Sequence, residues 1–244
     1  MPIHYARRLV GAQRTPRANR HLGLGLAGVA GAANAGGFLA VQQYTSHMTG
    51  VVSAMADHLA LGDWLLFAAG LASLGWFVLG AIASTLMVGW ARRRRLHSEY
   101  AAPLLLEALL LLCFGLMGQR LASVGSLMAP ATVSLLCFVM GLQNAVITKL
   151  SGAEIRTTHV TGIVTDIGIE IGRRLQPGNA VPDALRLRLL LQMAGAFFAG
   201  ALSGAIGFKA IGYVFTVPLA LLLVLLAAVP AADDLAGWLR ARKR

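Results

Sequence analysis

The sequence predicts an all-α integral membrane protein of about six transmembrane helices, arranged as two inverted three-helix repeats that each contain a re-entrant or broken-helix motif. Three observations predict this fold: the composition, the placement of basic residues and a motif that occurs twice. Hydrophobic residues make up 57% of the 244 positions and charged residues 13%, with a mean hydropathy of +0.69. A soluble domain needs more polar surface, so we expect a bilayer around most of the chain.

Six stretches are long and apolar enough to cross a bilayer, which takes roughly 20 mainly apolar residues. In chain order they are 22–44, 64–91, 100–119, 125–148, 186–207 and 210–230. Two further amphipathic stretches, 51–61 and 163–172, are too short to cross alone. We interpret both as half-helices that enter the membrane and return.

Basic residues are confined to the segments outside the apolar cores of the predicted spans. With both chain ends in the cytoplasm, nineteen Lys and Arg residues lie inside and two, Arg120 and Lys209, lie outside, as the positive-inside rule requires. The basic N-terminus (1–21) and tail (231–244) are then cytoplasmic, and we expect the basic segments to contact anionic lipids. The net charge of +11 does not indicate nucleic-acid binding, because the basic residues are not spread over one folded surface.

A motif of the form T-x-H-x-T-G follows both the first and the fourth predicted span. It begins at Thr45 and again at Thr157, a separation of 112 residues, and the pair Asn34-Ala35 precedes the first copy as Asn144-Ala145 precedes the second. With three spans in each repeat, the second repeat (125–230) enters the membrane from the side opposite to the first (22–119). This predicts an inverted topology.

The two motifs form the predicted substrate site. Unwound backbone inside a membrane is tolerated where it is buried in protein or lines a watery cavity, and helix N-termini that begin with a Thr-Gly pair attract anions or carboxylates. The histidines would orient the ligand or carry a proton, whereas the threonines and glycines could equally be ordinary caps and packing residues. The predicted substrate-binding residues are Asn34, His47, Thr49, Gly50, Gln143, Asn144, His159, Thr161 and Gly162.

Two acidic residues, Glu107 and Asp166, are candidates for ion coupling, because charges in or near a membrane are costly unless paired or functional. Alternatively, Glu107 pairs with a cytoplasmic arginine or faces a polar cavity, and Asp166 interacts with a helix dipole. We find no catalytic motif and expect no enzyme activity. The histidines lack carboxylate or thiolate partners at suitable spacing, so we expect neither a metal site nor another cofactor.

The segments that carry the motifs resemble a known family. They are Gly141-Leu142-Gln143-Asn144-Ala145, Arg156-Thr157-Thr158-His159-Val160-Thr161-Gly162 and Ser46-His47-Met48-Thr49-Gly50. They are similar to the YoaK family of bacterial membrane proteins, a domain of unknown function, and the resemblance covers roughly 22–230. It implies a bacterial inner-membrane protein, without naming a substrate or functional residues.

These observations predict a small secondary transporter of a small polar or anionic solute. One repeat would move against the other to give alternating access, and we expect a homodimer to brace this motion. Two alternatives stay open. A channel would use the same residues as a filter, and a non-transporting membrane sensor or scaffold would use the repeats for packing alone.

Overall fold

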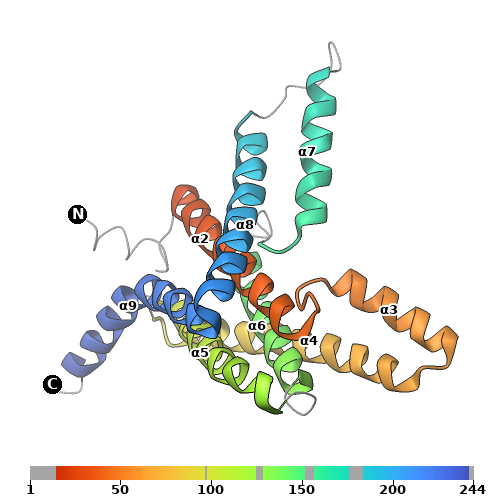
Figure 1. Cartoon of the computed structure of the whole chain (residues 1–244). Helices are drawn as coiled ribbons and strands as arrows, with labels where there is room; N and C mark the ends of the chain where they lie inside the picture. Colours follow the sequence, from red (N-terminus) through yellow and green to blue (C-terminus); the bar gives the residue numbers. More distant parts are fainter. Residues whose placement is uncertain (1–14, 97, 125–128, 152–156, 176–183, 242–244) are drawn as a thin grey trace.

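The computed structural model describes residues 15–96, 98–124, 129–151, 157–175 and 184–241, and within these ranges the regular structure is helical, without a β-strand (Figure 1). The helices are α2 (Pro16–Val41), α3 (Met48–Leu61), α4 (Trp64–Arg93), α5 (Ala101–Val124), α6 (Ala129–Ser151), α7 (Val160–Leu175), α8 (Ala184–Ile211), the 3₁₀-helix η2 (Gly212–Phe215) and α9 (Thr216–Ala241). The predicted all-α class is confirmed. The two short helices begin three residues earlier than predicted.

Several of these helices are long and apolar enough to cross a membrane. Among the described residues, five stretches meet this criterion: Arg17–Val41, Trp64–Arg93, Ala101–Gln119, Ala129–Ser151 and Ala184–Ala228. The last stretch, of 45 residues, includes α8, η2 and the first part of α9. A multi-pass membrane protein is therefore supported, and the number of about six spans stays a prediction.

Glycines bring the long helices of the core into backbone contact. A Cβ atom on Gly31 of α2 would lie 2.1 Å from the carbonyl oxygen of Phe197 on α8, and one on Gly141 of α6 would lie 1.9 Å from that of Phe77 on α4. Any larger residue at these positions would force the helices apart. Thus α2 packs closely against α8, and α6 packs in the same manner against α4.

Helices α2 and α6 cross each other in opposite directions. The side-chain amide of Asn19 donates to the Leu150 carbonyl at 3.2 Å, that of Gln143 donates to the Leu26 carbonyl at 3.2 Å, and Gly37 lies beside Leu136. Rising residue numbers on α2 therefore meet falling numbers on α6, so the two helices are antiparallel. Their crossing lies near the middle of each helix.

Each short helix folds back along the long helix that follows it, and Figure 1 shows α3 with α4, and α7 with α8, as two projecting arms. Met55 of α3 lies against Gly70 of α4, which places the start of α3 level with the middle of α4. Asp166 of α7 lies 3.4 Å from Arg186 of α8, which places the start of α7 roughly a third of the way along α8. Both motifs therefore lie beside the body of a long helix and not at its end.

Candidate functional site

An equivalent hydrogen bond fixes the segment before each short helix. The Ser46 hydroxyl donates to Asn34 Oδ1 at 3.0 Å, and the Thr158 hydroxyl donates to Asn144 Oδ1 at 2.7 Å. In both copies the asparagine belongs to the preceding long helix, α2 or α6. The two predicted asparagines therefore attach the T-x-H-x-T-G segments to the antiparallel helices of the core.

The motif histidine and glycine also have the same relationship in both copies. A Cβ on Gly50 would lie 2.6 Å from Nδ1 of His47, and a Cβ on Gly162 would lie 2.2 Å from Nδ1 of His159. The glycine thus leaves room for the imidazole against the first turn of the helix. In both copies the imidazole ring therefore occupies the space beside the glycine.

Both histidines and both second threonines of the motifs are on the surface of the protein. His47 and Thr49 are exposed at the start of α3, and His159 and Thr161 are exposed at the start of α7. His47 is the N-cap residue of α3, but its side chain forms no capping hydrogen bond. These side chains are therefore accessible to a solute from outside the core.

The first threonine of each motif was missing from the predicted site. Thr45 is 3% exposed and Thr157 is 0% exposed, and within the described residues neither hydroxyl oxygen has a hydrogen-bond partner. Such a buried hydroxyl typically costs about 1–3 kcal/mol. Both copies of the motif begin with threonine, and this repetition in the sequence could have identified both residues.

In this conformation the two motifs form separate groups. Asn34 and Asn144 lie on opposite sides of the crossing between α2 and α6, and at 1.5 Å per residue their levels along the helices differ by about 10 Å. Among the described residues no hydrogen bond or ion pair joins the group around His47 to the group around His159. A single central site that uses both motifs stays a prediction.

A buried polar pair lies beside the crossing of α2 and α6. Gln143 of α6 and Glu107 of α5 are both 0% exposed. The Gln143 amide that donates to Leu26 of α2 is also the polar group next to the Glu107 carboxyl. No arginine of the described residues forms an ion pair with Glu107. Glu107 therefore lies in the protein interior, and the arginine partner considered from sequence is not found among the described residues.

Asp166, the other acidic candidate, has a cationic partner. Its carboxylate lies 3.4 Å from the Arg186 guanidinium on α8. The neighbouring Glu170 is 1% exposed and receives a hydrogen bond of 2.9 Å from Arg173. Asp166 is the seventh residue of α7, beyond the first turn where a helix dipole acts most strongly. The ion pair therefore accounts for Asp166 better than the dipole does.

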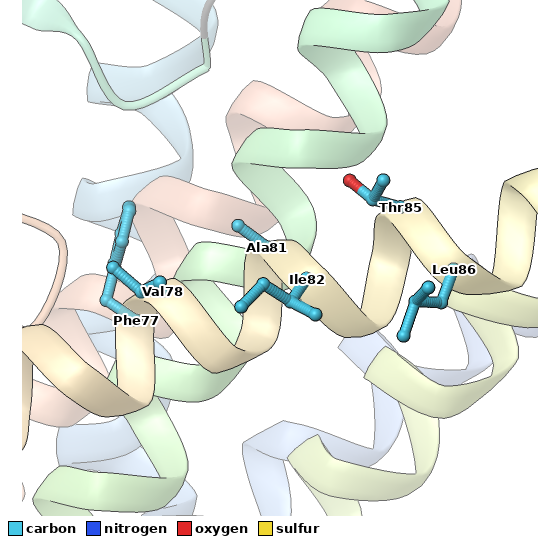
Figure 2. A pocket seen from close by; sticks show the side chains of 6 residues that line it. All are labelled: Phe77, Val78, Ala81, Ile82, Thr85 and Leu86. Atoms are coloured by element: carbon cyan, nitrogen blue, oxygen red, sulfur yellow. The ribbon is translucent and has the colours of Figure 1, made fainter.

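Two adjoining grooves follow α4. One, of about 330 Å³, lies between α4 and α6 and is lined by Phe77, Ala81, Thr85, Gly141, Asn144, Ala145, Thr148 and Lys149. The other, of about 300 Å³, is lined by α4 alone, and Figure 2 shows its six side chains along that helix, all of them apolar except Thr85. Only the first groove combines amide, hydroxyl and ammonium groups, and it includes the predicted Asn144.

The chain matches a known protein family. Residues 22–229 match the family described as "Protein of unknown function (DUF1275)". No curated protein and no solved structure matches the chain. The match covers more than half of the sequence and includes both motifs.

Proposed function

We propose that this chain, which belongs to the DUF1275 family of proteins of unknown function, is a small secondary transporter of a small polar or anionic solute. It would consist of two inverted halves with about six membrane spans, and alternating access would come from motion of one half against the other. The antiparallel crossing of α2 and α6 carries this proposal.

The crossing supports an inverted repeat because α2 and α6 occupy the same place in the two halves of the sequence. Asn34 corresponds to Asn144, and each binds the hydroxyl that precedes its motif histidine. Equivalent helices that run antiparallel are related by a two-fold axis perpendicular to them, which for spanning helices lies in the membrane plane. Repeats related by an axis along the membrane normal would run parallel.

The groove between α4 and α6 supports a polar or anionic solute. Thr85 offers a hydroxyl there and Lys149 a positive charge, whereas the Asn144 amide already donates to the Met140 carbonyl at 2.8 Å. Asn144 also binds Thr158, next to His159 and the N-terminus of α7, where free amides attract negative charge. A solute in this groove would therefore contact the residue that holds the second motif in place.

Exposed aromatic and apolar side chains on α4 support its placement in a membrane. Trp64 and Trp90 are 67% and 55% exposed near its two ends, and tryptophan prefers the interfaces of a bilayer. Their separation of 26 positions corresponds to roughly 40 Å of helix. Only 11% of the most apolar 18-residue part of α4 is buried within the protein. The rest of this surface must therefore be covered by lipid or by a second copy of the chain. This is consistent with a homodimer.

The remaining parts of the proposal come from charge and resemblance. We place both chain ends in the cytoplasm, the basic segments against anionic lipids and the protein in a bacterial inner membrane, as the YoaK-like motifs suggest. No step of the proposed transport requires a metal, a cofactor or enzymatic chemistry. Nucleic acid is not among the proposed partners.

A ligand screen followed by flux measurements tests the proposal. The purified protein and the His47→Ala/His159→Ala variant are screened by thermal shift against inorganic anions and small carboxylates, because a bound ligand stabilises the folded state. His58→Ala, on the same α3 helix but outside the motif, is the control. We expect a hit that is lost in the double variant and kept in the control.

Flux in proteoliposomes then separates the classes of function. Saturable uptake of the hit with counterflow supports the transporter. Current that does not saturate indicates the channel instead. Absence of both a hit and flux favours the sensor or scaffold and contradicts the proposal.

A further inference from the structure

We infer that Glu107 is a proton-binding site, closed in this conformation by the packing of α5 against α6 and opened when the two halves exchange conformations. The inference rests on the proposed function, because it names the coupling ion of that transporter and the residue that carries it.

Burial without a partner favours the protonated form of Glu107. Its side chain is 0% exposed, and neither carboxyl oxygen has a hydrogen bond of ordinary geometry within the described residues. An ionised carboxylate in such a place loses its hydration and gains no cation in return. A neutral carboxyl avoids this penalty, so the site holds a proton.

Gln143 provides an acceptor for that proton. One hydrogen of its amide is donated to the Leu26 carbonyl, whereas its Oε1 atom is buried and has no donor among the described residues. The protonated Glu107 can donate to this oxygen, which links the carboxyl to α2 through the amide of Gln143. An ionised Glu107 would leave both groups with unmet hydrogen-bonding needs.

No charged side chain of the described residues compensates Glu107. The titratable side chains described on the elements that pack against α5 are Arg17, Arg20 and His21 of α2, Arg92 and Arg93 of α4, Cys137 and Lys149 of α6, and Tyr213 of η2. Within the described residues none of them forms a hydrogen bond or an ion pair with Glu107, and the polar side chain that interacts with its carboxyl is Gln143. Binding or release of a proton by Glu107 therefore changes the net charge of this part of the protein interior.

The two halves differ where Glu107 lies. Helix α5 packs extensively against α6, whereas α9, its counterpart in the second half, makes few contacts with α2. The counterpart of Glu107 is Leu222, which is 41% exposed. If the halves exchange conformations, α9 closes on α2 and α5 separates from α6. Glu107 then meets water and transfers its proton to a water molecule, which leaves a carboxylate and a hydronium ion.

Infrared spectroscopy of the full-length protein in liposomes tests the proton site without a solute. A protonated carboxyl has its own carbonyl stretch, distinct from that of a carboxylate. We expect Glu107→Gln to remove such a band near neutral pH and Glu99→Gln to leave it, because Glu99 is paired with Arg92. A spectrum that keeps the band in Glu107→Gln, or has no such band in the wild type, overturns the inference.

A cross-link tests the opening. Ala33 and Leu222 are the counterparts of Gln143 and Glu107, so they should approach each other in the alternate state. The variant carries Ala33→Cys and Leu222→Cys in a background without Cys113 and Cys137. We expect a disulfide between the two new cysteines to hold the protein in that state. The Glu107 band should then exchange with deuterium faster than in the reduced protein. Equal rates, or failure of the folded protein to form the disulfide, overturn the opening. Solute flux enters neither measurement, so failure of the transporter proposal would be seen separately.

Discussion

Thr158 donates a hydrogen bond to Asn144 over 2.7 Å, from the segment just before α7 to the long helix before it. Ser46 and Asn34 repeat this relationship in the first half of the chain at 3.0 Å. Because Ser and Thr both supply a hydroxyl, the interaction is kept although the residue differs. The start of each short helix is thus fixed to the antiparallel pair at the centre of the protein.

We expect the two hydroxyl–asparagine bonds to contribute similarly to stability. Double-mutant cycles of Asn144→Ala with Thr158→Val, and of Asn34→Ala with Ser46→Ala, should each give a coupling free energy of about 0.6–1 kcal/mol. The measurement is the free energy of unfolding in detergent. A coupling near zero in one cycle and clear in the other would show that the two motifs are not equivalent.

Gly50→Ala and Gly162→Ala should displace the imidazole rings of His47 and His159, because the new methyl group would overlap each ring. Since a histidine side chain can rotate away, we expect each variant to lose less than about 1 kcal/mol of unfolding free energy. We expect the thermal shift caused by the ligand to be mostly lost, because the rings are displaced from the site. Gly168→Ala on α7 has open space at its Cβ and is the control. An unchanged ligand response in both motif variants would contradict a role for the ring positions.

Two glycines of α4 should respond oppositely to the same substitution. A Cβ on Gly80 would lie 2.0 Å from the Phe138 carbonyl oxygen, whereas one on Gly75 would meet nothing within 4 Å. Gly80→Ala must separate α4 from α6 and should destabilise the protein by about 1–3 kcal/mol. Gly75→Ala should be neutral or stabilising by up to about 1 kcal/mol, because alanine favours the helix. Equal unfolding temperatures for the two variants would argue against this close crossing.

The sequence predicted the helices well because long apolar runs leave few alternatives to a helix in a membrane. It placed the start of the short amphipathic stretch at residue 51, whereas α3 begins at Met48, so the Thr49-Gly50 pair expected at the helix start lies within its first turn. It also missed the reason for Gly50, since contact between a histidine and a glycine three residues later depends on the orientation of the ring. Local patterns therefore located the motifs more reliably than they explained them.

The pairing of helices was beyond the reach of sequence patterns. Sequence analysis grouped the spans into two consecutive three-helix units, whereas α2 packs most closely on α8 and α6 on α4. Helices that are apolar on every side have no stripe that marks the face for a particular neighbour. The contact between Glu107 and Gln143 depends on the packing of α5 against α6. The residue types alone suggested that each has a function, but only the structure shows that the two side chains are neighbours.

Cysteine labelling in intact cells or oriented vesicles tests the inverted topology through equivalent ends of α4 and α8. Asp63 precedes α4, and Leu185 lies in the first turn of α8. In a background without Cys113 and Cys137, Asp63→Cys should react with a membrane-impermeant maleimide from outside, and Leu185→Cys only after access to the cytoplasmic side. Arg95→Cys, after the other end of α4, is the control that should match Leu185→Cys. The 30 residues of α4 cover about 45 Å, more than the hydrocarbon core. If Asp63→Cys and Leu185→Cys reacted from the same side, the halves would be parallel, and exchange of conformations between them would no longer give alternating access.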